Sequence, residues 1–207
     1  MQAYHFFNPL LTPNQAWAAF DWQINPLSQD SLADIAEAAE TCLPLARQQP
    51  LWVPCNAAWL GKNQFSEFIK KLGRDQVILA FPAGTQASAE SEAACQALRK
   101  DGLHVAIEIV DSSILKKLTT TTFDYLAFEA EHAHSGVPLI DLINAHQYGY
   151  QLVARDIKTH ERFDWAVAKR FSLLSSQFVA TVDARAPVDA DTTRLKLLKL
   201  LNLVVQD

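Results

Sequence analysis

Two histidines at alternate positions are the side chains most directly suited to metal chemistry. They are His132 and His134 in the run Glu131-His132-Ala133-His134. Neutral imidazoles bind transition metals well, but a third ligand would have to converge on this pair to complete a site. A solvated loop after a strand is the commoner explanation of such a polar run. We therefore favour a loop at residues 131–134.

Hydroxyl-bearing residues offer two further candidates. Asp111-Ser112-Ser113 follows an apolar run and would either contact a phosphate at a helix start or cap that helix. No glycine-rich phosphate loop supports the first role, so the sequence favours a cap. Ser175-Ser176 lacks a nucleophile elbow, and no Ser, His and Asp trio has a diagnostic spacing. The sequence contains no recognisable serine-nucleophile motif.

Charge and cysteine content exclude several classes of protein. The chain has 207 residues and a net charge of −5, without a window rich in Lys and Arg, so nucleic-acid binding is disfavoured. Cys42, Cys55 and Cys95 are odd in number and widely spaced, which fits buried thiols in a reducing cytosol better than disulfides or a metal knuckle. No signal peptide or bilayer-length apolar run is present, so we expect a cytoplasmic protein without membrane contact.

Short apolar runs alternate with helical patterns along most of the chain. Near-continuous hydrophobicity over four or five residues is typical of parallel strands covered on both faces. The expected strands are 51–53, 77–81, 105–109, 125–128, 151–154 and 171–174. The expected helices are 31–48, bent or split by Pro44, and 64–72, 88–100, 139–146 and 159–169. This alternation predicts an α/β parallel sheet, either closed into a barrel or open and doubly wound.

The two ends of the chain depart from this alternation. Residues 4–7 and 17–24 read as strands, and the turn-rich spacer 8–14 between them is too short for a helical crossover. They therefore predict an antiparallel pair at the start of the fold. Residues 192–205 contain too many leucines for one narrow helical stripe, so we expect this segment to bury itself against the barrel, a second subunit or another domain.

The segment 152–166, which includes Ala154-Arg155-Asp156-Ile157-Lys158-Thr159, resembles the late strand-to-helix unit of EAL domains, the cyclic di-GMP phosphodiesterase family. The usual run there is Ala-Glu-x-Val-Glu-Thr. Phe20-Asp21-Trp22 falls where the name-giving Glu-Ala-Leu sits. Further segments that match in register are Asn8-Pro9, 102–108, 123–129 and 171–179. Residues 194–201 resemble the linker helix through which one bacterial subgroup continues into a helical HDOD domain.

The resemblance implies a parallel β/α (TIM-like) barrel of EAL type, with an irregular or antiparallel first strand. Its ligand site would lie at the carboxyl ends of the strands. We expect residues 1–190 to form the barrel domain and residues 191–207 to form a leucine-rich helix that packs on it or links it to a further domain.

Family members hydrolyse the phosphodiester with Mg²⁺ or Mn²⁺ held by carboxylates and one asparagine. By the resemblance, Asp21, Glu108 and Glu129 keep an acidic side chain at three such positions. Arg155 replaces the late-strand Glu and places a guanidinium where divalent cations need negative charge. The other family positions hold residues that cannot replace the family's side chain: Pro54, Ala80, Ile109, Ala127 and Ser175.

The resemblance with its substitutions predicts a catalytically inactive EAL-like signalling domain, with no catalytic residue and no metal. The ligand-pocket candidates are Asp21, Glu108, Glu129 and Arg155. The three carboxylates form either a relic cation-binding cluster or ion pairs with Arg155, and we favour ion pairs. A protein partner or a homodimer is the expected partner, with cyclic di-GMP as a second candidate. The alternatives are an active phosphodiesterase with a rearranged Mg²⁺ or Mn²⁺ site and an unrelated α/β-barrel enzyme.

Overall fold

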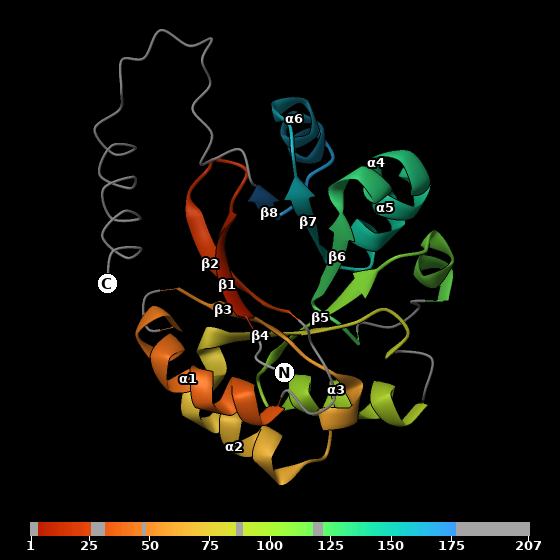
Figure 1. Cartoon of the computed structure of the whole chain (residues 1–207). Coiled ribbons are helices and arrows are strands. Elements are labelled where there is room, and N and C mark those ends of the chain that lie inside the picture. The colour runs from red at the N-terminus through yellow and green to blue at the C-terminus, as the bar shows by residue number, and fades with distance from the viewer. Residues whose placement is uncertain (1–3, 26–31, 47–48, 86–88, 118–121, 177–207) are drawn as a thin grey trace, which may run out of the picture. The chain divides into compact units, whose positions relative to one another are not determined.

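A computed structural model describes residues 4–25, 32–46, 49–85, 89–117 and 122–176. Its eight strands form one closed barrel in which each strand pairs with its neighbours in sequence and β1 pairs with β8 (Figure 1). The strands are β1 Tyr4–Leu11, β2 Trp17–Asn25, β3 Leu51–Pro54, β4 Val77–Phe81, β5 His104–Ile109, β6 Tyr125–Glu129, β7 Gln151–Ile157 and β8 Leu173–Ser176. The predicted barrel is confirmed. The leucine-rich segment and the predicted boundary at residue 190 lie outside the described residues.

Strand β1 is the irregular member of the barrel. It runs antiparallel to both β2 and β8, whereas the other neighbours pair in parallel. The predicted antiparallel start is therefore confirmed. The predicted spacer at 8–14 is too long, because β1 continues through Asn8 and Pro9 to Leu11. These turn-forming residues are held in the strand by pairing with Asp21 and Phe20 of β2.

Alternate residues of each strand point into the barrel, because successive side chains of a strand leave on opposite faces. A buried layer inside the barrel takes one residue from each strand and two from β4: Leu10, Ala19, Trp52, Ile78, Ala80, Ala106, Ala127, Val153 and Leu173. Four alanines make room for the indole of Trp52. The same alternation places Asp21, Glu108 and Arg155 two residues further along β2, β5 and β7, on the inner side of the barrel mouth.

In the described part of the chain, six α-helices surround the barrel (Figure 1). They are α1 Leu32–Ala46, α2 Asn63–Leu72, α3 Ala89–Lys100, α4 Ala130–Gly136, α5 Leu139–Gln147 and α6 His160–Ala168. Helix α1 runs as a single helix with Pro44 inside it, so of the predicted bend or split the split does not occur. Helix α2 shows why these segments pack as they do, since its buried residues Phe65, Phe68, Ile69 and Leu72 recur at helical spacing.

Two smaller expectations can be compared with the structure directly. The side chain of Asp111 accepts hydrogen bonds from the amide and the hydroxyl of Ser113, at 2.9 and 2.8 Å, where a 3₁₀ helix begins at Ser112. The predicted cap is confirmed. The sequence also favours core and barrel-mouth packing over a stacking platform for its five tryptophans; Trp22, Trp52 and Trp59 are buried core residues, whereas Trp17 is 39% exposed. Among the described residues, no helix is long and apolar enough to cross a membrane.

Candidate functional site at the barrel mouth

Three strands bring a charged side chain to the mouth of the barrel. Asp21 lies on β2, Glu108 on β5 and Arg155 on β7, and each belongs to the inward-facing set of its strand. Carboxyl ends of parallel strands meet at one end of a barrel, so residues far apart in sequence become neighbours there. Asp21 and Arg155 are 134 positions apart in the chain.

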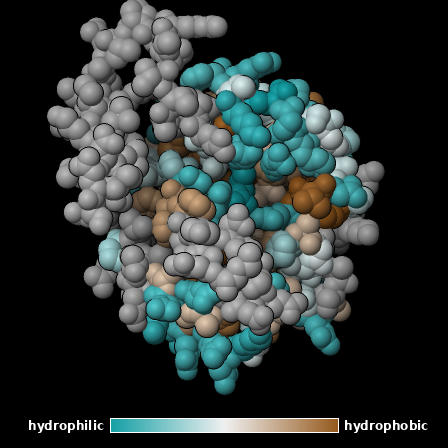
Figure 2. All heavy atoms as spheres, in the orientation of Figure 1, coloured by the Kyte–Doolittle hydropathy of each residue, from teal (hydrophilic) through white to brown (hydrophobic). Residues whose placement is uncertain are grey.

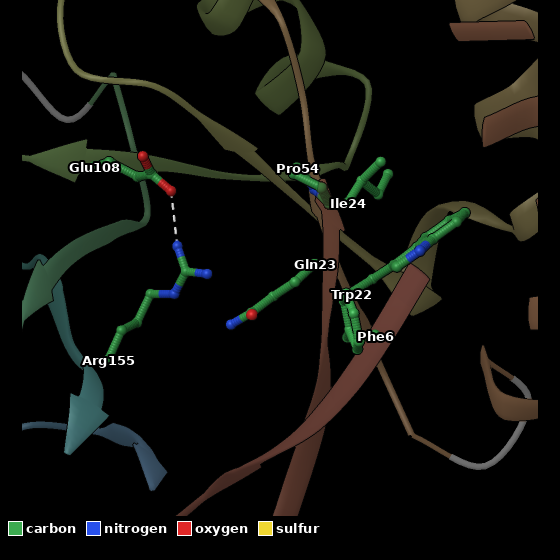
Figure 3. A pocket seen from close by; sticks show the side chains of 7 residues that line it. All are labelled: Phe6, Trp22, Gln23, Ile24, Pro54, Glu108 and Arg155. Atoms are coloured by element: carbon green, nitrogen blue, oxygen red, sulfur yellow. Dashed lines mark hydrogen bonds and ion pairs between the residues drawn. The ribbon is translucent and has the colours of Figure 1, made fainter. Parts of the chain in front are cut away.

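Arg155 bridges the two carboxylates. Its Nη1 donates to Oε1 of Glu108 at 2.7 Å, and this bond is drawn as a dashed line in Figure 3. Its Nη2 contacts Oδ2 and Oδ1 of Asp21 at 3.1 and 3.3 Å. The guanidinium therefore uses its two terminal nitrogens on two different strands. Its Nε is buried and has no hydrogen-bond partner among the described residues.

Because Asp21 is more deeply buried than Glu108, its ion pair with Arg155 holds the guanidinium in place more strongly. Asp21 is fully buried, and its Oδ2 also accepts a bond from Nε2 of Gln23 at 3.0 Å. The side chains of Arg155 and Glu108 are 23% and 39% exposed. Burial alone would lower the pKa of Arg155, but the charges of Asp21 and Glu108 raise it above its ordinary value. Arg155 is therefore a fixed positive charge at the mouth.

Glu129 does not join this cluster. It ends β6 and pairs in register with Arg155 across the β6–β7 ladder, but its side chain is exposed. Among the described residues, no hydrogen bond or ion pair connects it to Arg155. The structure thus brings together three of the four candidate residues from the sequence and leaves Glu129 at the rim.

The donor set at the mouth does not fit the Mg²⁺ or Mn²⁺ that the EAL resemblance implies. Both carboxylates already bind a guanidinium, and no group of three His, Cys, Asp or Glu residues in the described part of the chain could hold a metal ion. Ala80 and Ala127 are buried in the barrel layer, and Ile109 is buried and offers no ligand atom. Hard divalent cations need several oxygen ligands, which these residues do not supply.

A hollow of about 370 Å³ opens beside the cluster (Figure 3). It is lined by Phe6, Trp22, Gln23, Ile24, Pro54, Glu108 and Arg155. In Figure 3 the side chain of Gln23 extends toward Arg155. Sequence reasoning missed Phe6, Gln23 and Ile24 as lining residues. Gln23 could have been found, because it lies two residues beyond Asp21 and so faces the same side of β2.

The histidine run is not the predicted loop. Residues 130–136 form helix α4, in which Glu131 binds Arg162 of α6 through two bonds of 2.9 and 3.0 Å. The hydrogen bond from Arg162 lowers the pKa of Glu131. His134 packs edge-on against Trp165 with ring centroids 5.1 Å apart. These contacts explain the polar run as a packed helix that follows β6 directly.

Two of the three cysteines are buried free thiols. Cys55 follows β3 and Cys95 lies on α3, and burial raises the pKa of both, to about 11 for Cys95. A neutral buried thiol is a poor nucleophile and a poor metal ligand. The side chain of Cys42 is outside the described set.

Solved EAL structures share this fold. BlrP1 from Klebsiella pneumoniae, in a manganese and cyclic di-GMP complex, has a TM-score of 0.67 and 16% identity, over 86% of this chain and 55% of that chain. A standalone EAL protein from Vibrio cholerae O395, bound to cyclic di-GMP, has a TM-score of 0.65 and 10% identity, over 86% of this chain and 90% of that chain. The EAL enzyme Bd1971, with cAMP and cyclic di-GMP bound, has a TM-score of 0.66 and 13% identity, over 84% of this chain and 60% of that chain.

At such identities the likeness establishes an EAL-like fold. The chain spans 60% of the length of Bd1971 and 55% of BlrP1. The sequence matches no protein-family model and no curated protein.

Proposed function

We propose that this chain is a catalytically inactive EAL-like signalling domain that acts by binding in bacterial cyclic di-GMP-related regulation. The observation that carries the proposal is that Arg155 forms ion pairs with both Asp21 and Glu108 at the barrel mouth. In an EAL-like fold this is the end of the barrel where a ligand would bind. A side-chain cation there neutralises the carboxylates that a metal would require.

Loss of the metal ligands removes the family's means of hydrolysis. Divalent cations activate the attacking water and stabilise charge on the phosphate. A guanidinium supplies positive charge but cannot lower the pKa of a bound water as a metal does. Asp21 is buried, held by Arg155 and Gln23, and therefore not free to serve as a general base. No other described residue at the mouth combines a free carboxylate with metal-ligand neighbours.

Local charge favours a protein partner over the nucleotide. Asp21, Glu108 and Arg155 leave one uncompensated negative charge at the mouth, which opposes a phosphodiester in the absence of metal. Large apolar side chains are exposed on and beside α5: Val110, Leu139, Ile140, Ile143 and Tyr148. Figure 2 shows a strongly hydrophobic patch on the side of the barrel where α5 and the residues after β5 lie. Such patches are typical of protein-interaction surfaces.

A hydrolysis assay tests the proposal. The full chain is incubated with cyclic di-GMP and Mn²⁺, and the products are separated by chromatography. We expect no linear dinucleotide above the level of buffer alone, and the same result for Asp21→Asn. Linear product that Asp21→Asn abolishes would contradict the proposal and establish the alternative, an active phosphodiesterase with a rearranged metal site.

A further inference from the structure

We propose that the hollow at the barrel mouth binds the head group of an organic cation, an ammonium or guanidinium on an apolar stem. The inference rests on the proposed function and names the chemistry that such a binding domain would recognise. The proposal starts from three electron-rich groups that face the hollow, contributed by Glu108, Gln23 and Phe6.

Two side-chain oxygens and one aromatic ring that line the hollow have no partner among the described residues. Glu108 uses Oε1 for Arg155, and its Oε2 accepts no hydrogen bond from the described residues. Gln23 donates its amide nitrogen to Asp21, and its Oε1 is likewise without a described partner. Phe6 is 53% exposed and makes no ring contact in the described part of the chain. A carboxylate oxygen, an amide oxygen and an aromatic face each attract a cation.

The guanidinium of Arg155 is already paired with both carboxylates of the mouth. Nη1 and Nη2 of Arg155 bind the two carboxylates, and its Nε is buried away from solvent. An anionic ligand would therefore compete with Asp21 and Glu108 for the one guanidinium and would add to their excess negative charge. A cationic head group meets no such competition, because it restores the balance of two carboxylates against one guanidinium.

The remaining walls fit an apolar stem. Ile24 and Pro54 line the hollow beside the polar groups. A volume of about 370 Å³ accommodates a side chain or a small amine. An aliphatic stem that carries a charged head commonly packs its methylenes on such a wall. Arginine and lysine side chains of a protein partner and free alkyl amines share this chemistry.

Calorimetric titration of the full chain tests the inference with defined probes. The probes are agmatine, a free alkyl amine that carries an ammonium and a guanidinium group, the blocked peptide acetyl-Ala-Arg-Ala-amide, and the same peptide with neutral citrulline in place of arginine. We expect saturable one-site binding of agmatine or the arginine peptide and none of the citrulline peptide. Binding of the peptide alone indicates a side chain of a protein partner as the source, and binding of agmatine alone indicates a free amine.

Matched variants locate the binding. Glu108→Gln keeps the shape and the acceptor for Arg155 but removes the charge, and we expect it to weaken binding about tenfold. Phe6→Leu keeps an apolar wall without the aromatic face, and we expect a loss of about two- to fivefold. Glu67→Gln removes an exposed charge on α2 and should change nothing. Thermal melting of each variant confirms that it is folded.

No saturable binding of either cation would overturn the inference, as would equal binding of the citrulline peptide or an unchanged affinity in Glu108→Gln. These outcomes leave the hydrolysis assay unaffected, so the inference fails separately from the proposed function. Turnover of cyclic di-GMP would instead remove the proposed function on which the inference rests.

Discussion

Arg155 connects the charged side chains at the barrel mouth. It binds a fully buried carboxylate, Asp21, and a half-exposed one, Glu108, on two other strands. Removal of one partner of a buried pair leaves an uncompensated charge, and this cost exceeds the net worth of the pair itself. The loss of stability on removing Arg155 should therefore come mainly from the buried charge of Asp21, which is left without a cation.

At this scale we predict that Arg155→Met lowers the free energy of unfolding by about 2–4 kcal/mol. Methionine fills most of the same volume but leaves Asp21 buried without a cation. The double variant Asp21→Asn, Arg155→Met should recover part of the loss, because it buries no net charge at that position. Urea denaturation at neutral pH measures both values. A single variant within about 0.5 kcal/mol of the native protein would contradict a structural role for the pair.

The ion pairs of this cluster could be predicted in part from the sequence. The family resemblance selected Asp21, Glu108 and Arg155 as pocket candidates, and the pairing that charge balance favoured is present among these three. The sequence misplaced Glu129, because register and burial decide which of several acidic residues reaches the guanidinium. It missed Phe6, because β1 runs against the other strands and brings its amino-terminal end to the mouth.

At the scale of elements, three helices end with the same hydrogen-bond pattern. In α5 the amide of Gly149 donates to the carbonyl of His146 at 3.0 Å, and the amide of Tyr150 donates to that of Ala145 at 3.1 Å. In α6 the amide of Arg170 donates to Val167, and that of Phe171 to Ala166. Helix α3 ends in the same way. This is the Schellman motif, and it requires a left-handed residue just beyond the helix.

Two of these helices have glycine at the left-handed position and α6 has Arg170, with φ of 61°. We predict that Arg170→Gly raises the free energy of unfolding by about 0.5–1 kcal/mol, because glycine adopts this conformation without a Cβ clash. Gly149→Ala should lower it by at least as much, since φ there is 85° although no atom lies near an added Cβ. Thermal unfolding of the two variants, compared with the native protein, measures both changes. Equal shifts of the same sign would contradict the backbone explanation.

The helix and strand boundaries show where hydrophobic periodicity is enough to predict an element from the sequence. Helices α2 and α3 were predicted within one residue, because the buried face of α2 repeats regularly and a left-handed glycine follows each helix, Gly73 and Gly102. Helix α4 was missed, since it has only seven residues and starts immediately after β6. Strand β7 was predicted too short because Arg155 and Asp156 are polar. The pairing with β8 shifts register between Ala154 and Ile157, and Asp156 within this irregularity has φ of 55°.

At the scale of the whole molecule, closure of the barrel was not decided by strand and helix pattern. An alternating α/β sequence fits both a barrel and an open sheet. Closure depends on β1, which pairs with β2 along its whole length and with β8 through Leu10 and Leu11. Such a contact joins the two ends of the described barrel. It follows from non-local packing, which only the family resemblance anticipated.

In the proposed inactive domain, Arg155 takes the place of divalent metal at the barrel mouth. Electron paramagnetic resonance of free Mn²⁺, with the native full chain titrated at equal concentrations, tests it most directly. We predict that the protein leaves the signal of free Mn²⁺ unchanged, and that the Asp21→Asn variant also leaves it unchanged. Stoichiometric loss of the free signal with native protein, restored by Asp21→Asn, would show that the mouth binds metal and would contradict the account.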